Sequence, residues 1–184
     1  MPKRAALDLA AMLSGGDRRS IGRSGEAAAL AIADVATRLE LVRLLDSTDP
    51  LVRMRAADAL EKVSREAPEL LRVFRALFLR MAGPERQPEV RWHLAQIIPR
   101  LSLNADERAR AVEALRHYLE EDGSAIVQTW ALNAIVEIAR EDERFGTLAE
   151  SLLQEGLESR HASVRSRSRA LLLERERGPK SGDA

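Results

Sequence analysis

The sequence contains no cysteine among its 184 residues, which excludes disulfide bonds, thiolate metal sites and cysteine nucleophiles. It has no apolar run near the ~20 residues that span a bilayer, so we expect no membrane partner and a cytoplasmic location. Residues 1–13 show no clear cleavage site and predict a first helix in place of a signal peptide. No segment alternates β-branched with polar residues, so we expect no β-sheet.

Aromatic residues make up only 3% of the chain, and lysine occurs three times, so almost all positive charge is arginine. The formal net charge is zero, from 29 basic and 29 acidic residues. This balance argues against a chain that bulk charge draws to nucleic acid or a membrane. Alanine, leucine, arginine and glutamate dominate instead, and these residues favour helix throughout.

The clearest pattern in the sequence is that of an amphipathic helix beginning at Asp49. Asp49 can cap the free N–H groups of a helix, and Pro50 suits its first position because proline has no N–H to leave unpaired. Apolar side chains then recur at the spacing of one helix face, at Val52, Ala56, Ala59, Leu60 and Val63. The run therefore predicts an amphipathic helix with a well-defined start.

The same pattern returns at a nearly constant period. Its valine recurs at Val52, Val90, Val127 and Val164, in steps of 38, 37 and 37 residues. A fixed period in the high thirties with helical spacing inside it is typical of a solenoid. We expect ten helices in five hairpins within a single domain over residues 1–177, followed by a disordered tail over residues 178–184.

The run Asp49-Pro50-x-Val52-Arg53-x-x-Ala56-x-x-Ala59-Leu60 resembles the second helix of a HEAT repeat. The chain as a whole resembles small bacterial HEAT-repeat proteins that carry the sequence found here from Gly15 to Arg23 near their start. The resemblance implies an all-α fold, a right-handed α-solenoid of about five HEAT-like (armadillo-like) hairpins. For function it implies binding alone.

The helices are expected near residues 3–13, 24–36, 37–46, 49–67, 68–81, 89–101, 104–120, 124–140, 144–157 and 162–175. Pro99 should kink or shorten the helix over residues 89–101, because proline removes a backbone hydrogen bond and crowds the preceding turn.

Signs of catalysis are few. The three histidines fall far apart on different predicted helices, and no hydrolase or metalloprotease motif occurs. We therefore expect no enzyme, no catalytic residue, no metal and no cofactor. The glycine-rich basic loop suits an anion weakly, through Asp17, Arg18, Arg19 and Arg23, although it lacks the ending of a P-loop and an ordinary turn is the alternative.

The second helices of the hairpins carry the candidate binding residues, because in HEAT arrays these helices usually line the concave side. Positions three and six residues after each repeat valine share one flank of the helix, away from the core stripe. The candidates on or beside that flank are Arg55, Asp58, Arg91, Trp92, His93, Gln96, Trp130 and Asn133. A structural alternative is that the arginines tie neighbouring repeats together and the tryptophans cover the seams between them.

Exposed arginine and tryptophan favour protein-binding surfaces. The sequence therefore predicts a non-enzymatic protein-interaction or scaffold module whose partner lies on the concave face. One alternative is a nucleic-acid-binding protein, since HEAT-like DNA glycosylases combine tryptophans with a catalytic aspartate, as Asp58, Trp92 and Trp130 do superficially. A bilin-lyase-like accessory protein is a further alternative that rests on fold analogy alone.

Overall fold

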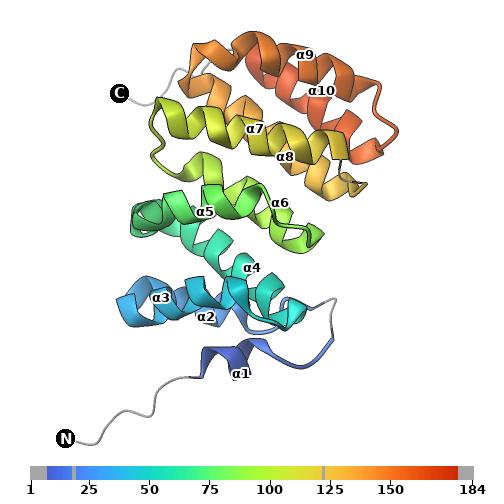
Figure 1. Ribbon diagram of the computed structural model, residues 1–184. Helices are drawn as coiled ribbons and strands as arrows, with labels where there is room; N and C mark the ends of the chain where they lie inside the picture. Colours follow the sequence, from blue (N-terminus) through green and yellow to red (C-terminus); the bar gives the residue numbers. More distant parts are fainter. Residues whose placement is uncertain (1–7, 18–19, 122, 178–184) are drawn as a thin grey trace, which may run out of the picture. The chain divides into compact units, whose positions relative to one another are not determined.

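The computed structural model describes residues 8–17, 20–121 and 123–177. Within these ranges the chain forms ten α-helices and four short 3₁₀-helices and no strand, which confirms the all-α prediction (Figure 1). It divides into two compact units, residues 1–74 and residues 75–184, which we call unit 1 and unit 2. The predicted tail over residues 178–184 and the start of the first predicted helix lie outside the described residues.

Unit 1 is built around its longest helix, α4. Its elements are α1 (Leu9–Leu13), α2 (Ser24–Ala33), α3 (Val35–Arg43), η1 (Leu44–Asp46), α4 (Pro50–Glu66) and η2 (Pro68–Phe74). Helix α4 packs against α1, α2 and α3. The predicted start of α4 is confirmed, since the Asp49 carboxylate accepts the N–H of Leu51 at 2.9 Å and Pro50 opens the helix.

The predicted stripe of α4 forms the core of unit 1. Its five members, Val52, Ala56, Ala59, Leu60 and Val63, are all buried. The alanines lie in the same stripe as the larger side chains and allow a neighbouring helix to approach closely. Periodicity alone therefore located the buried face of this helix correctly.

Unit 2 consists of three helical hairpins. Its elements are α5 (Arg75–Ala82), α6 (Pro88–Ile97), η3 (Ile98–Arg100), α7 (Ala105–Glu121), α8 (Ala125–Glu141), η4 (Glu143–Phe145), α9 (Gly146–Leu157) and α10 (Ala162–Glu176). The second helices α6, α8 and α10 pack side by side, while α5 packs on α7 and α7 on α8. The repeat valines Val90, Val127 and Val164 are buried, as the period predicts.

Two predicted helices differ from the structure in an informative way. Helix α6 ends at Ile97 and gives way to a 3₁₀ turn that contains Pro99, so the predicted shortening is confirmed. The helix predicted over residues 68–81 is wrong in its first half, which is the 3₁₀-helix η2. The apolar residues Leu71 and Phe74 lie three apart there, which matches the three-residue turn of a 3₁₀-helix.

Candidate binding surfaces

Arg55 on α4 is not an exposed binding residue, contrary to the prediction. Only 2% of it is accessible to solvent. Its guanidinium donates hydrogen bonds to a ring of backbone carbonyls, those of Leu13 (2.9 Å), Ser14 (3.4 Å), Gly15 (2.6 Å), Asp17 (3.0 Å) and Ser20 (3.1 Å). The side chain therefore holds the segment between α1 and α2 against α4, and it is occupied by its own chain.

One glycine of the loop, Gly22, is required by its close approach to Arg55. Gly22 has a φ of +54°, and a Cβ added there would lie 2.9 Å from Cζ of Arg55. The loop turns carbonyl oxygens toward a cation, whereas an anion site needs converging N–H groups. Arg23 binds Glu26 at 2.6 Å, while Arg18 and Arg19 lie outside the described residues. Anion binding at this loop thus gains no support.

Asp58, the next candidate on α4, is also buried and occupied. Its carboxylate accepts hydrogen bonds from the hydroxyl of Ser24 on α2 and from the ammonium of Lys62 on α4. The polar flank of α4 that we define by Arg55 and Asp58 therefore faces the amino-terminal part of unit 1. The flank is an internal interface between helices.

Two candidates on α6 have internal roles in unit 2. Arg91 is buried, donates to the carbonyl of Glu85 at 2.7 Å and lies 4.8 Å from the centre of the Tyr118 ring. The Tyr118 hydroxyl in turn donates to the carbonyl of Ala82 at 2.7 Å. His93 is buried as well, and its ring meets the Trp92 ring edge to face at 5.4 Å.

Asn133 joins α8 to α10. Its amide oxygen accepts from the guanidinium of Arg167, and its amide nitrogen donates to Glu137 at 2.7 Å. The pair Arg140 and Glu174, 2.8 Å apart, links the same two helices. This arrangement supports the structural alternative for the polar positions, in which they connect neighbouring repeats.

Three candidates remain partly exposed, namely Trp92 and Gln96 on α6 and Trp130 on α8. These helices pack against each other. Gln96 donates from its amide nitrogen to the carbonyl of Trp92 at 3.3 Å, a contact that does not use its amide oxygen. We call these three residues the tryptophan face, and it contains both tryptophans of the sequence.

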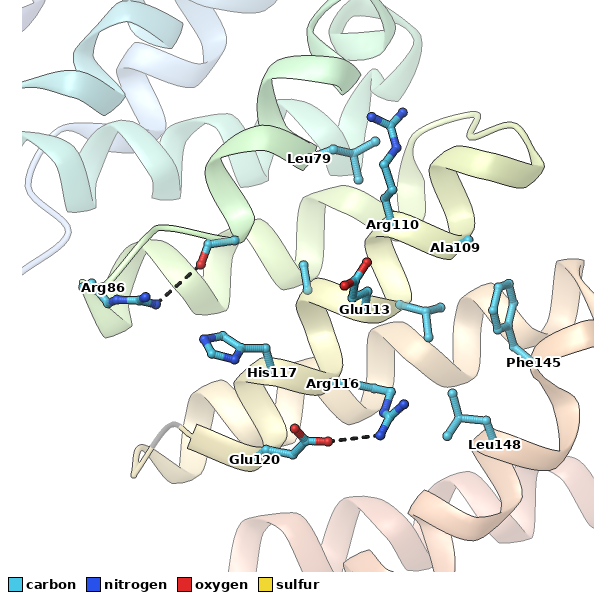
Figure 2. Close-up of a pocket in the computed structure, with 13 residues that line it drawn as sticks. Leu79, Arg86, Ala109, Arg110, Glu113, Arg116, His117, Glu120, Phe145 and Leu148 are labelled. Atoms are coloured by element: carbon cyan, nitrogen blue, oxygen red, sulfur yellow. Dashed lines mark hydrogen bonds and ion pairs between the residues drawn. The ribbon is translucent and has the colours of Figure 1, made fainter.

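A second surface of unit 2 was not predicted from the sequence. A hollow of about 820 Å³ lies along the outer side of α7, and we call it the α7 hollow (Figure 2). Leu79 and Arg86 flank it on one side of α7, and Phe145 and Leu148 flank it on the other. The remaining lining residues are Gly83, Ala109, Arg110, Val112, Glu113, Ala114, Arg116, His117 and Glu120. The missed signal was the run of small and charged residues opposite the buried stripe of α7.

The charges along α7 are only partly neutralised by neighbours. Arg116 pairs with Glu120 at 3.1 Å, and His117 lies 3.3 Å from the carboxylate of Glu121. Arg110 and Glu113 are both exposed, and neither forms a hydrogen bond or an ion pair with any residue in the described ranges. The hollow therefore offers one cation and one anion, a single helical turn apart, to whatever covers it.

The start of α7 is fixed by a capping box. The Asn104 side chain accepts the N–H of Glu107 at 2.9 Å, and the Glu107 carboxylate accepts the N–H of Asn104 at 2.9 Å. Arg75 on α5 also donates to Glu107, at 2.8 Å. The Asn104 N–H and the Arg75 guanidinium hold the pKa of Glu107 below its usual range, against the opposing effect of burial.

Comparison with protein-family models, with curated protein sequences and with solved structures finds no match to this chain. Across the described residues, no three histidine, aspartate or glutamate side chains gather closely enough to hold a metal ion. No helix in those same ranges has the length and apolar character needed to cross a membrane.

Proposed function

We propose that the protein is a non-enzymatic binding module that takes a protein partner on the tryptophan face of unit 2. One observation carries the proposal. Trp92 and Trp130 stay partly exposed on two helices that pack together, while the other predicted residues are occupied by internal contacts. Partly exposed tryptophan favours a binding surface, because tryptophan is enriched among the residues that dominate binding energy.

The chemistry of the tryptophan face suits a polypeptide. Two indole rings offer a large apolar area with little loss of side-chain freedom on binding, and each carries an N–H donor. Gln96, one turn after Trp92 on α6, adds an amide that can pair with a peptide backbone. A partner segment that buries an apolar side chain against the rings and keeps its backbone near Gln96 would use all three residues.

The charges on the neighbouring helices favour protein over nucleic acid. On α8 and α10, Arg140 is paired with Glu174, and Arg167 is bound by Asn133. A phosphate backbone needs a row of cations that are available for contact. The carboxylates among these arginines would repel it.

The wider architecture is part of the same proposal. The period of the repeat valines, the buried stripe in each repeat helix and the side-by-side packing of α6, α8 and α10 support a stack of HEAT-like hairpins. The HEAT resemblance implies that this stack is right-handed. In such a stack the second helices form the inner face, where a scaffold protein of the cytoplasm would hold its partner.

The test compares matched variants. Partners are captured from the native cell with the unaltered protein, identified, purified and titrated by calorimetry against Trp92→Ala, Trp130→Ala and Gln96→Ala. The control is Leu39→Ala, which truncates an exposed apolar residue of unit 1. We expect Trp130→Ala to weaken binding by about tenfold or more and Leu39→Ala to leave it unchanged.

Two results would contradict the proposed binding of a protein partner. Folded tryptophan variants that bind the partner at full strength would exclude the tryptophan face. Capture of DNA or RNA, with an affinity that falls steeply as salt is added, would favour the nucleic-acid alternative.

A further inference from the structure

The outer face of α7 has a charge pattern that is complementary to itself. Six residues, Asp106, Ala109, Arg110, Glu113, Ala114 and His117, are at least partly exposed on one side of the helix, and the exposed Glu120 and Glu121 follow them on the same side at its end. At 100° per residue all six fall within one arc, opposite the buried residues Ala111 and Leu115. They form a continuous strip, of which all but Asp106 line the α7 hollow.

The strip is symmetric about the midpoint between Ala111 and Val112. Positions 106 and 117, 109 and 114, and 110 and 113 lie at equal distances on either side of that point. Each pair is complementary: an acid with a histidine, an alanine with an alanine, and an arginine with a glutamate. A helix laid antiparallel on α7 by a two-fold axis would bring the members of each pair to the same height.

We propose that a second copy of this chain covers the α7 hollow, through an antiparallel contact of α7 with its symmetry mate. A two-fold contact is isologous, so each favourable pair forms twice. Arg110 of one protomer faces Glu113 of the other, and the reverse pair forms on the other side of the axis. The alanines at the contact let the two helices approach closely.

The central pairs of the contact use groups that the isolated chain leaves available. Arg110 and Glu113 form no ion pair within the described ranges, so dimerisation breaks no existing pair at these two positions. The partly exposed apolar residues Phe145 and Leu148 at the side of the hollow would become covered. Burial of that apolar surface supplies affinity, and the charge pairs fix the antiparallel register.

The proposal is independent of the function of the tryptophan face. That face belongs to the layer of second helices, α6 and α8, whereas the dimer contact belongs to α7. A dimer formed in this way would present two tryptophan faces and bind a repetitive partner with increased avidity. Either surface can fail its test without affecting the other.

Charge reversal gives a sharp test by sedimentation velocity on the full chain at matched concentrations. We expect the unaltered protein to dimerise. Arg110→Glu alone and Glu113→Arg alone place like charges opposite each other at both pairs, so each should weaken dimerisation by about tenfold or more. An equimolar mixture of the two variants restores both pairs and should form a mixed dimer, and the double variant should form its own dimer.

Two controls separate charge complementarity from loss of fold or of total charge. Circular dichroism checks that each variant keeps its helix content. Arg169→Glu reverses an exposed arginine on α10 and should leave dimerisation unchanged. A monomeric unaltered protein at every concentration, variants that dimerise as well as the unaltered chain, or a mixture that stays monomeric would each overturn the proposal.

Discussion

Helices α4 of unit 1 and α8 of unit 2 come from the same repeat pattern but use their polar flanks differently. Their core positions agree, since Leu60 on α4 and the equivalent Ile135 on α8 are both fully buried. At the position three residues after the repeat valine they diverge. Arg55 is buried among backbone carbonyls of its own chain, while Trp130 stays partly exposed.

The difference arises from what lies beside each helix. In unit 1 the segment between α1 and α2 folds around Arg55, and α2 supplies Ser24 for Asp58. In unit 2 the flank of α8 is bound by α10 at Asn133 but leaves Trp130 partly uncovered. A position in a repeat thus defines a direction from the helix axis, and the neighbour in that direction decides the role of the side chain.

The largest expected effect tests what the two helices share. Leu60→Asp and Ile135→Asp each place an unpaired charge in a fully buried site, and each should lower the free energy of unfolding by about 4 kcal/mol or more. Urea denaturation measures both. A lower free energy of unfolding in only one of the two variants would show that α4 and α8 do not bury this position in the same way.

The second prediction tests the divergent position directly. Arg55→Ala removes the guanidinium donor that five backbone carbonyls share and should lower the free energy of unfolding by about 3 kcal/mol. Trp130→Ala, at the equivalent position of α8, should cost less than Arg55→Ala, because part of the Trp130 side chain is already accessible to solvent. Thermal melts compare the two.

A chemical rescue checks the cause. Methylguanidinium at low concentration should enter the site left by Arg55→Ala and recover part of the lost stability, because the carbonyl ring suits a guanidinium. It should not stabilise Trp130→Ala or the unaltered protein. Equal melting temperatures for the Arg55 and Trp130 variants would contradict the proposed difference between the occupied flank of α4 and the partly exposed flank of α8.

The third prediction uses two glycines of the same loop. Gly15 and Gly22 both have positive φ, but an added Cβ meets nothing within 4 Å at Gly15 and lies 2.9 Å from Arg55 at Gly22. Gly22→Ala should therefore destabilise unit 1 by about 1 kcal/mol more than Gly15→Ala. The excess should vanish in an Arg55→Ala background, and an excess that persists there would contradict the contact.

The smallest expected effect concerns the capping box of α7, which has no counterpart at α4. Because the pKa of Glu107 is lowered in the folded state, its contribution to stability is present above the unfolded pKa of about 4.3. That contribution is lost as the pH falls through the lower folded pKa.

Glu107→Gln keeps the shape of the capping box but removes the charge that faces Arg75. It should cost about 1 kcal/mol near pH 7 and progressively less as the pH falls below about 4. Melting temperatures measured from neutral to acid pH follow the difference. A constant gap between variant and unaltered protein would contradict the lowered pKa.

The sequence predicted the local features of the fold well. Helix α8 was expected over residues 124–140 and runs from Ala125 to Glu141. Caps and core stripes depend on residues within one or two turns, so the pattern around Asp49 and Leu60 contained enough information. The 3₁₀-helix η2 was missed because its three-residue apolar spacing is also compatible with an α-helix.

The binding surface was harder to predict, because its residues are defined by distant parts of the chain. The carbonyls that occupy Arg55 lie 35 to 42 residues away in sequence. Arg167, which occupies Asn133, lies 34 residues away. Helical spacing gave the flank on which these side chains lie, but it contained no information about which neighbour covers that flank. The α7 hollow was missed for the same reason.

Amide hydrogen exchange of the whole chain, with and without its captured partner, tests the central contrast most directly. If the tryptophan face binds the partner and the polar flank of α4 is internal, exchange should slow in residues 88–97 and 125–141. It should stay unchanged in residues 50–66. Slower exchange confined to residues 50–66, with α6 and α8 unaffected, would place the partner on the helix that we consider occupied and would contradict the account.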